Sequence, residues 1–313
     1  MHVINTKEVN HVLGVTTPTN VAGVGEHIQG WNVDLRNSMV KGDRAMGPPQ
    51  QIQAFPSPLP TPINIEQLEL QLQGYDPAKA QFLLDGFKFG FSIGYFGSST
   101  TPNSSNLKSA LQQPDVVDNK LKKELAAGRI AGPFLIEPFH TFHCSPLGVV
   151  PKKIQGEFRL IHHLSWPHGS SINDGIPHEL ATVQYARLDD AVQAKAIMHF
   201  GQGCYLAKTD IRSAFRIIPV APSDYNLLGF KWRDRYYYDR CLPMGCASSC
   251  NIFEAFSSCL EWMVLQTQEA GSVLHILDDF LFVSKDSRHC KRDLNTFISL
   301  CSQLGVPLAK EKN

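Results

Sequence analysis

Two adjacent acids, Asp278 and Asp279, lie between the apolar runs Val273–Leu277 and Phe280–Val283, and this pattern is the one in the sequence best suited to chemistry. Carboxylates inside a buried strand are costly unless they are paired or bound to a cation. At the tip of a hairpin the same acids could instead be solvated turn residues, because Asp favours turns. The pattern therefore predicts either a cation-binding tip or a polar turn.

A third acid, Asp210, ends another apolar run, Cys204–Ile211. If this strand lies beside the 273–283 hairpin, three carboxylates meet at one edge of a sheet. Their charges would raise one another's pKa unless a divalent cation neutralised them. Carboxylate oxygens suit Mg²⁺, which also binds phosphate oxygens. Two such ions, with Mn²⁺ as a substitute, can activate a hydroxyl and stabilise a leaving phosphate in an in-line displacement.

The elements that must position these acids follow from hydrophobic periodicity and turn residues. Val117, Leu121 and Leu125 recur at helical spacing before Gly128. Strands and helices alternate irregularly, which indicates an α+β fold rather than repeated βαβ units. The predicted elements are a helix from about 116 to Gly128, strands at Ser145–Lys153, Glu157–Leu164 and Cys204–Ile211, hairpins at Leu227–Tyr238 and Val273–Val283, and helices at Ala247–Gln268 and Asn295–Leu304.

Six segments in order resemble the motif series of reverse transcriptases: SPLGVVPKK, FRLIHHLS, KTDIRSAFRIIPV, CLPMGCASSCNIFE, ILDDFLF and LGVPLAKEK. The residues in these segments are most similar to those of the reverse transcriptases of tyrosine-recombinase retrotransposons of the DIRS/Ngaro type. The resemblance covers about residues 110–313 and, more weakly, 70–100. It implies right-hand polymerase fingers and palm, an antiparallel palm sheet packed on helices, and RNA-directed DNA synthesis on a primed RNA or DNA template.

The resemblance assigns roles to residues around the acids. Asp210 matches the first catalytic aspartate, and Asp278 with Asp279 matches the later pair. Phe215 matches an aromatic side chain that lies under the sugar and favours dNTPs over rNTPs. Its alternative reading is an ordinary core Phe. Ala214 would let the 3′-hydroxyl of the sugar approach the backbone.

The resemblance also implies a triphosphate site. Arg159 matches a fingers arginine whose planar guanidinium suits phosphate oxygens. Lys152 or Lys153 matches a lysine on the γ-phosphate, and the sequence does not choose between them. Solvated turn charge is the alternative for both lysines.

Two further segments complete the implied site. Met244 and Gly245 match the loop beside the templating base, where Gly permits close backbone approach. Lys312 matches a lysine proposed to protonate pyrophosphate. Met244 stands where Gln is common, and Ile276 stands where an aromatic residue is usual. These departures remove no carboxylate.

The resemblance and the composition together predict the domain organisation. Because the sequence stops where the last palm strands should begin, we expect a truncated palm and no thumb. The predicted regions are a loosely ordered N-terminal extension at 1–64, a helical lead-in with a polar loop at 65–109, fingers at 110–203, and a palm at 204–313 with a fingers-linked hairpin near 225–240.

Composition limits the remaining function classes. The net charge is zero, so overall charge names no partner, although the stretches 120–163 and 284–313 are basic. The eight cysteines lack paired zinc spacing and are expected to be free thiols. No apolar run is long enough to span a membrane, so an intracellular location in nucleus or cytoplasm, without a membrane partner, is expected.

Three functions remain open from the sequence. The first is a reverse transcriptase module that uses dNTPs and a primed template, with other retroelement-encoded domains as partners. The second is an inactive, truncated retroelement remnant or a nucleic-acid-binding protein without turnover. The third is a different palm polymerase. The DIRS-like sequences of residues 145–165 and 242–255 argue against this third function.

Overall fold

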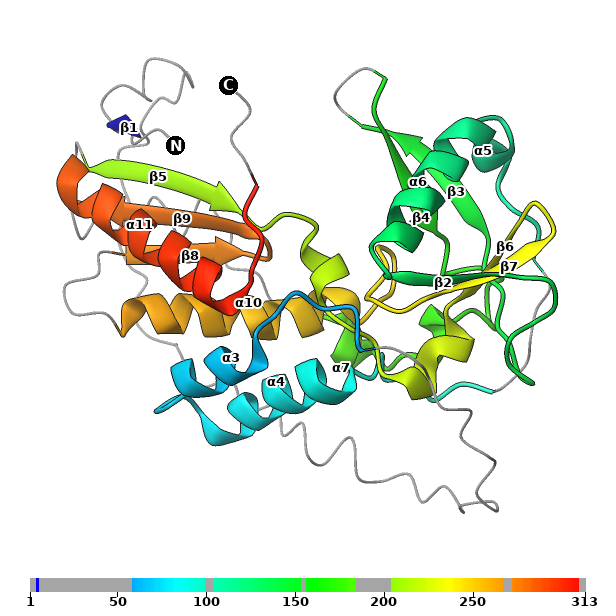
Figure 1. Cartoon of the computed structure of the whole chain (residues 1–313), viewed down its shortest axis with the longest axis horizontal. Coiled ribbons are helices and arrows are strands. Elements are labelled where there is room, and N and C mark those ends of the chain that lie inside the picture. Colours follow the sequence, from blue (N-terminus) through cyan, green and yellow to red (C-terminus); the bar gives the residue numbers. More distant parts are fainter. Residues whose placement is uncertain are drawn as a thin grey trace, which may run out of the picture.

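The computed structural model describes residues 4–5, 58–98, 104–152, 156–183, 204–266 and 272–309. Helices and antiparallel sheets are mixed, as the α+β prediction requires. Figure 1 shows two halves, one around a four-stranded sheet with long helices and one around two smaller sheets with short helices. We call these the large-sheet half and the small-sheet half.

The large sheet carries the acids. Its order is β1 (Ile4–Asn5), β5 (Tyr205–Asp210), β9 (Asp279–Ser284) and β8 (Ser272–Ile276), and each neighbouring pair is antiparallel. The predicted strand at 204–211 and the predicted 273–283 hairpin are thus confirmed. They are also neighbours, which is the condition on which the three-carboxylate prediction depended.

Two helices cover one face of this sheet, α10 (Ser249–Leu265) and α11 (Ser287–Leu304) (Figure 1). Phe280 and Phe282 of β9 both contact the ring of Phe297 on α11. Because side chains alternate along a strand, Asp279 and its partner Asp210 lie on the opposite face. The acids therefore point away from the helical layer.

Helix α11 begins eight residues before the predicted Asn295. Asp286 caps it, since its side chain accepts a hydrogen bond from His289 N at 2.9 Å. The first two turns are largely polar, so periodicity alone missed them. Gly305 closes the helix at φ 76°, where a Cβ would meet Pro62 O at 2.1 Å.

The small-sheet half contains the predicted helix at 116–128 as α6 (Pro114–Ala126) and the two predicted hairpins. It also contains a short helix and a strand that periodicity did not predict, α5 (Lys108–Leu111) and β2 (Ile130–Phe134). The hairpins are β3 (Leu147–Pro151) with β4 (Phe158–His162), and β6 (Gly229–Trp232) with β7 (Arg235–Asp239).

The β6–β7 hairpin belongs to the small-sheet half. Its tip residues Arg233 and Asp234 both have positive φ, as a two-residue hairpin turn requires. Strand β7 pairs with β2, and Phe230 and Trp232 are buried in one core with Val117 of α6. The prediction that this hairpin is linked to the fingers remains a proposal that this packing supports.

Helices α3 (Ile65–Gln71) and α4 (Pro77–Phe89) lie beneath α10 in Figure 1, and both contain buried leucines. The segment 58–64 runs before them and bonds to both halves. On the large-sheet side, Thr61 Oγ1 donates to Ile217 O at 2.8 Å and Asn64 N donates to Leu304 O at 2.9 Å. Next to β7 of the small-sheet half, Arg240 Nη2 donates to Pro58 O at 3.1 Å. The expectation for residues 6–57 lies outside the described residues.

All eight cysteines carry free thiols, and seven of them are buried. Within the described ranges, no helix combines the length and the apolar character needed to cross a membrane.

Candidate active site

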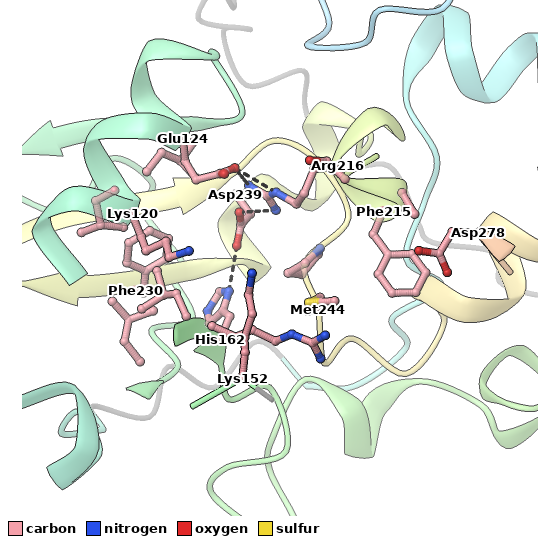
Figure 2. Close-up of a pocket in the computed structure, with 18 of the residues that line it drawn as sticks. Lys120, Glu124, Lys152, His162, Phe215, Arg216, Phe230, Asp239, Met244 and Asp278 are labelled. Atoms are coloured by element: carbon pink, nitrogen blue, oxygen red, sulfur yellow. Dashed lines mark hydrogen bonds and ion pairs between the residues drawn. The ribbon is translucent and has the colours of Figure 1, made fainter. Parts of the chain in front are cut away.

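A cavity of about 590 Å³ lies where the two halves meet. Its small-sheet wall includes Lys152 and Arg159, and its large-sheet wall includes Phe215 and Asp278 (Figure 2). Six of the residues proposed from sequence line it: Lys152, Arg159, Ala214, Phe215, Met244 and Asp278. Residues that come from five of the six quoted segments are thus brought to one space.

The acids gather at one end of the large sheet. Asp210 is the direct partner of Asp279 in the β5–β9 register, and Asp278 follows Leu277 at the tip of the β8–β9 hairpin. Leu277 has φ 52°, a conformation that a non-glycine residue adopts only under strain. Burial raises the pKa of Asp278, and the charges of Asp279 and Asp210 raise it further. The three carboxylates therefore repel one another across this end of the sheet.

The acids do not form a ready-made cage. Asp279 is half exposed and its carboxylate binds Lys208 Nζ at 2.9 Å. No group of three His, Cys, Asp or Glu side chains in the described part of the chain is arranged to hold a metal ion. The structure brings Asp210, Asp278 and Asp279 to one place but directs Asp279 towards a neighbouring cation of the protein.

Phe215 and Ala214 lie on η3 (Ala214–Ile217), one turn of 3₁₀ helix. Ser213, immediately before it, has φ 60° and so reverses the chain after β5. The Phe215 ring packs edge-on against Phe253 of α10, with ring centroids 5.5 Å apart. In Figure 2 the ring lies beside Asp278. Phe215 is therefore partly a packing residue and partly a wall of the cavity.

The opposite wall is basic. Arg159 is exposed on β4, and Lys152 follows β3 and binds Glu157 at 2.9 Å. Lys120 of α6 also lines the cavity, and periodicity gave no reason to select it. Burial and the charges of Lys152 and Lys123 lower the pKa of Lys120. This wall holds mutually repelling cations, which an anion would stabilise.

Met244 is 45% exposed and lines the cavity, whereas Gly245 does not. Gly245 has φ 106°, and a Cβ there would lie 2.9 Å from the backbone oxygen of His162. The close approach that this glycine permits is thus to β4 of the protein itself. Asn173 Nδ2 fixes the loop by donating to Gly245 O at 2.8 Å. The other two predicted residues, Lys153 and Lys312, lie outside the described residues.

Sequence reasoning missed a largely buried charge cluster in the lining of the cavity. We call it the Arg216 cluster; its members are Glu124, His162, Arg216 and Asp239 (Figure 2). Arg216 binds Asp239 at 2.7 Å and Glu124 at 3.0 Å, and Asp239 binds His162 Nδ1 at 2.9 Å. His162 and Asp239 are 77 residues apart in the sequence, and Glu124 and Arg216 are 92 residues apart. No local sequence pattern could therefore predict these contacts.

The electrostatics of this cluster are those of a well-paired buried site. Burial alone would lower the pKa of Arg216, but Asp239 and Glu124 raise it above its ordinary value. Burial alone would raise the pKa of Asp239, but Arg216 and His162 hold it below its ordinary value. Both charges are therefore retained inside the protein.

Comparison with known proteins identifies the family. Residues 150–313 match the family described as "Reverse transcriptase (RNA-dependent DNA polymerase)". The chain belongs to the reverse transcriptase family. The match begins at the end of β3 and includes Arg159, Phe215 and all three aspartates. A search of the curated proteins found no match.

The fold of this reverse transcriptase domain is similar to that of foamy viral enzymes. Native Prototype Foamy Virus protease-reverse transcriptase has 18% identity and a TM-score of 0.53 over 78% of this chain and 32% of its own. Foamy viral protease-reverse transcriptase with dsDNA has 14% identity and a TM-score of 0.53, over 79% and 51%. The same enzyme with RNA/DNA hybrid has 13% identity and a TM-score of 0.53, over 79% and 33%. The chain spans about a third to a half of the length of these structures.

Proposed function

We propose that the chain is the fingers-and-palm part of a reverse transcriptase that adds dNTPs to a primer on an RNA or DNA template. The observation that carries this proposal is the single cavity with cations on one wall and with Phe215 and Asp278 on the other. Within it, the small-sheet half corresponds to fingers and the large-sheet half to palm. The domain limits given above from sequence are part of the proposal.

Asp210, Asp278 and Asp279 fit a divalent cation site. The register places Asp210 beside Asp279 and next to Asp278; burial raises the pKa of Asp278, and the charges of Asp279 and Asp210 raise it further. Carboxylate oxygens gathered in this way suit Mg²⁺. We assign these three residues as ligands of two Mg²⁺ ions, for which Mn²⁺ can substitute. The bound ions supply activation of a primer 3′-hydroxyl and charge stabilisation of the departing pyrophosphate. Asp279 must exchange its bond to Lys208 for this role.

The protein's own cations would hold the triphosphate. Arg159 presents an exposed, planar guanidinium that suits paired phosphate oxygens. Lys120 and Lys152 line the same wall, so a triphosphate there would relieve the repulsion between them. Lys153 is the alternative to Lys152, and Lys312 is assigned to proton delivery to pyrophosphate.

The sugar would lie over Phe215, whose ring stands beside Asp278 (Figure 2). A 2′-hydroxyl at that place would meet the ring and would find no hydrogen-bond partner on it, so dNTPs would be favoured. Ala214 leaves room for the 3′-hydroxyl. Met244 and Gly245 would contact the base pair from the neighbouring loop.

The finer identity is part of the same proposal. The six motifs quoted above support a retrotransposon of the DIRS/Ngaro type, and other retroelement-encoded domains would be the protein partners. Complexes of the foamy viral enzymes with dsDNA and RNA/DNA hybrid support a primed template as the nucleic-acid partner.

Primer extension on poly(rA)/oligo(dT) with Mg²⁺ and dTTP tests the proposal. Asp278→Asn and Asp210→Asn should each abolish incorporation, while Asp234→Asn, at a turn carboxylate that is 90% exposed, should leave it unchanged. Incorporation at the wild-type rate by either of the first two variants would show that the carboxylates are wrongly assigned.

Phe215→Ala tests the sugar contact separately. The variant should incorporate UTP more efficiently relative to dTTP, because the ring that excludes the 2′-hydroxyl is gone. An unchanged preference would leave Phe215 as a packing residue of the Phe253 contact only.

One observation favours a second candidate, a nucleic-acid-binding protein or retroelement remnant without turnover. The bond between Asp279 and Lys208 keeps the acids from forming a three-ligand group. A folded wild-type protein that binds template-primer tightly but incorporates no nucleotide with Mg²⁺ or Mn²⁺ would establish this second function.

A further inference from the structure

We infer that Arg216 is a positioning residue for sugar selection, because the Arg216 cluster holds Phe215 at its place in the cavity. The inference rests on the proposed function and deepens it, since it names a residue that sets the choice between dNTP and rNTP without touching either. Arg216 and His162 lie within two of the quoted motifs, but the resemblance assigned neither of them a role, and Glu124 and Asp239 lie outside the motifs.

The two neighbouring side chains point in opposite directions. In Figure 2 the Phe215 ring lies beside Asp278, whereas the Arg216 guanidinium is directed to Glu124 and Asp239 in the small-sheet half. A fixed Arg216 therefore fixes the backbone from which Phe215 projects. Both residues line the cavity, but Arg216 can be changed while the Phe215 ring itself is kept.

The backbone that carries Phe215 has little stability of its own. Its single 3₁₀ turn is closed by Arg216 N donating to Ser213 O at 2.7 Å and Ile218 N donating to Phe215 O at 3.2 Å. An isolated turn of this length is not stable in water, so tertiary contacts must set its place. These contacts include the hydrogen bond from Thr61 Oγ1 to Ile217 O and the packing of Phe215 on Phe253. The Arg216 side chain adds the charged contacts of the turn.

The guanidinium joins four residues, from α6 and from the stretch 239–242, to this turn. Besides Glu124 of α6 and Asp239 of β7, it donates from Nη1 to Cys241 O at 3.2 Å and Leu242 O at 3.3 Å. Leu242 begins the loop that carries Met244. A lysine keeps the charge but cannot make these bonds at once, because it is a point charge with no planar fork.

The cluster also reaches the triphosphate wall. Asp239 binds His162 Nδ1 at 2.9 Å, and His162 lies on β4 three residues after Arg159. The sugar contact, the template-side loop and the strand of the phosphate-binding arginine therefore share one anchor. A shift of the anchor moves the ring relative to the bound sugar, and displacements of a fraction of an ångström matter at such a contact.

Arg216→Lys is the decisive variant, and it is compared with wild type and Phe215→Ala in single-nucleotide extension with dTTP or UTP. We expect its preference for dTTP over UTP to fall on the order of tenfold, in the direction of Phe215→Ala, with primer-template affinity retained. The matched control is Arg129→Lys, because Arg129 binds the same Glu124 at 2.8 Å but is not in the cavity wall. It should keep the wild-type preference.

Glu124→Gln is a second test of the same inference, because it removes one charged partner of Arg216 and keeps the Arg216 side chain. It should lower the preference in the same direction but less, since Asp239 still holds the guanidinium. If Arg216→Lys does not fold, this variant decides.

The possible results distinguish a failure of the positioning role of Arg216 from a failure of the proposed polymerase function. An active wild type, a relaxed Phe215→Ala and an unchanged preference in the folded cluster variants would overturn the inference and leave the proposed function intact. Equal loss of dTTP and UTP use in Arg216→Lys, with the preference preserved, would assign Arg216 to stability alone. A wild type that neither incorporates dTTP nor binds it in preference to UTP would overturn both.

Discussion

Two buried histidines stand in two differently balanced charge clusters. The Arg216 cluster sets two carboxylates against a guanidinium, with His162 at one end. The second, which we call the His275 cluster, places His275 of β8 between Glu254 and Glu261 of α10. One cluster joins the two halves of the molecule, and the other pins the acid-bearing hairpin to its helix.

The source of positive charge is what distinguishes them. Arg216 is charged at every pH at which the protein folds, so the first cluster keeps its positive charge. His275 is charged only when protonated; burial opposes this, but Glu254 and Glu261 raise its pKa to about 9. A rise in pH above neutrality therefore leaves the positive charge at the joint between the halves in place, whereas it removes the positive charge that attaches the hairpin. Asp278 and Asp279 add further negative charge to the same hairpin.

Removing the guanidinium should be the largest disturbance. Arg216→Met leaves Asp239, which is 5% exposed, without its guanidinium partner, while Glu124 keeps Arg129. We therefore expect a loss of about 3–5 kcal/mol in the free energy of unfolding. Urea unfolding at pH 7 measures it. Arg233→Met removes an exposed pair with Asp118 and should cost about 1 kcal/mol or less. Equal losses in the two variants would show that burial does not matter here.

Raising the pH should disturb only the His275 cluster. The folded pKa lies above the ordinary 6.5, so the stabilisation is complete below pH 6.5 and is lost as the pH rises through about 9. The loss should be on the order of 3 kcal/mol. His275→Gln should abolish this part of the pH dependence, and the exposed control His178→Gln should retain it. Identical pH profiles in both variants would contradict the comparison.

Neutralising Asp278 should reduce the repulsion between the carboxylates at the tip of the β8–β9 hairpin. Because its folded pKa is raised, its carboxylate opposes folding at neutral pH, and Asp278→Asn should stabilise by about 0.5–1 kcal/mol. The gain should shrink as the pH falls through the folded pKa of Asp278, where the wild-type group is itself neutral. A gain that persists in acid would have another cause. This variant should combine higher stability with lost incorporation.

Removing Lys208 should have the smallest effect. Both partners of the Lys208–Asp279 pair are more than half exposed, so Lys208→Met should change the free energy of unfolding by about 0.5 kcal/mol or less. Thermal unfolding beside Arg216→Met gives the contrast. A loss as large as that of Arg216→Met would place this pair among the structural contacts.

The elements that sequence predicted well are those with local signals. Helix α6 shows its buried stripe in Val117 and Leu121 and ends before Gly128, and the β6–β7 hairpin shows its turn in Arg233-Asp234. The gathering of Asp210 with the 278–279 pair also followed from simple rules, since a strand and a hairpin that end in acids can meet only at one end of a sheet.

The elements that escaped prediction depend on distant partners. Glu124, Asp239 and His162 are ordinary surface residue types until the fold buries them around Arg216. His275 reads as one more residue of an apolar strand, although two glutamates one above the other on α10 enclose it. The start of α11 depends on a single cap, Asp286, before a polar stretch. The directions of the carboxylates are likewise a property of their neighbours, as Lys208 shows.

The segment 58–64 has a practical consequence for where the protein can be cut. It lies far upstream of the family match at 150–313, yet Pro58, Pro60 and Thr61 bond to Arg240, Cys241 and Ile217. We therefore expect that the part of the chain needed for stable folding extends beyond the family match at 150–313. A protease that cleaves between the segment 58–64 and α3 should therefore loosen the core of the protein.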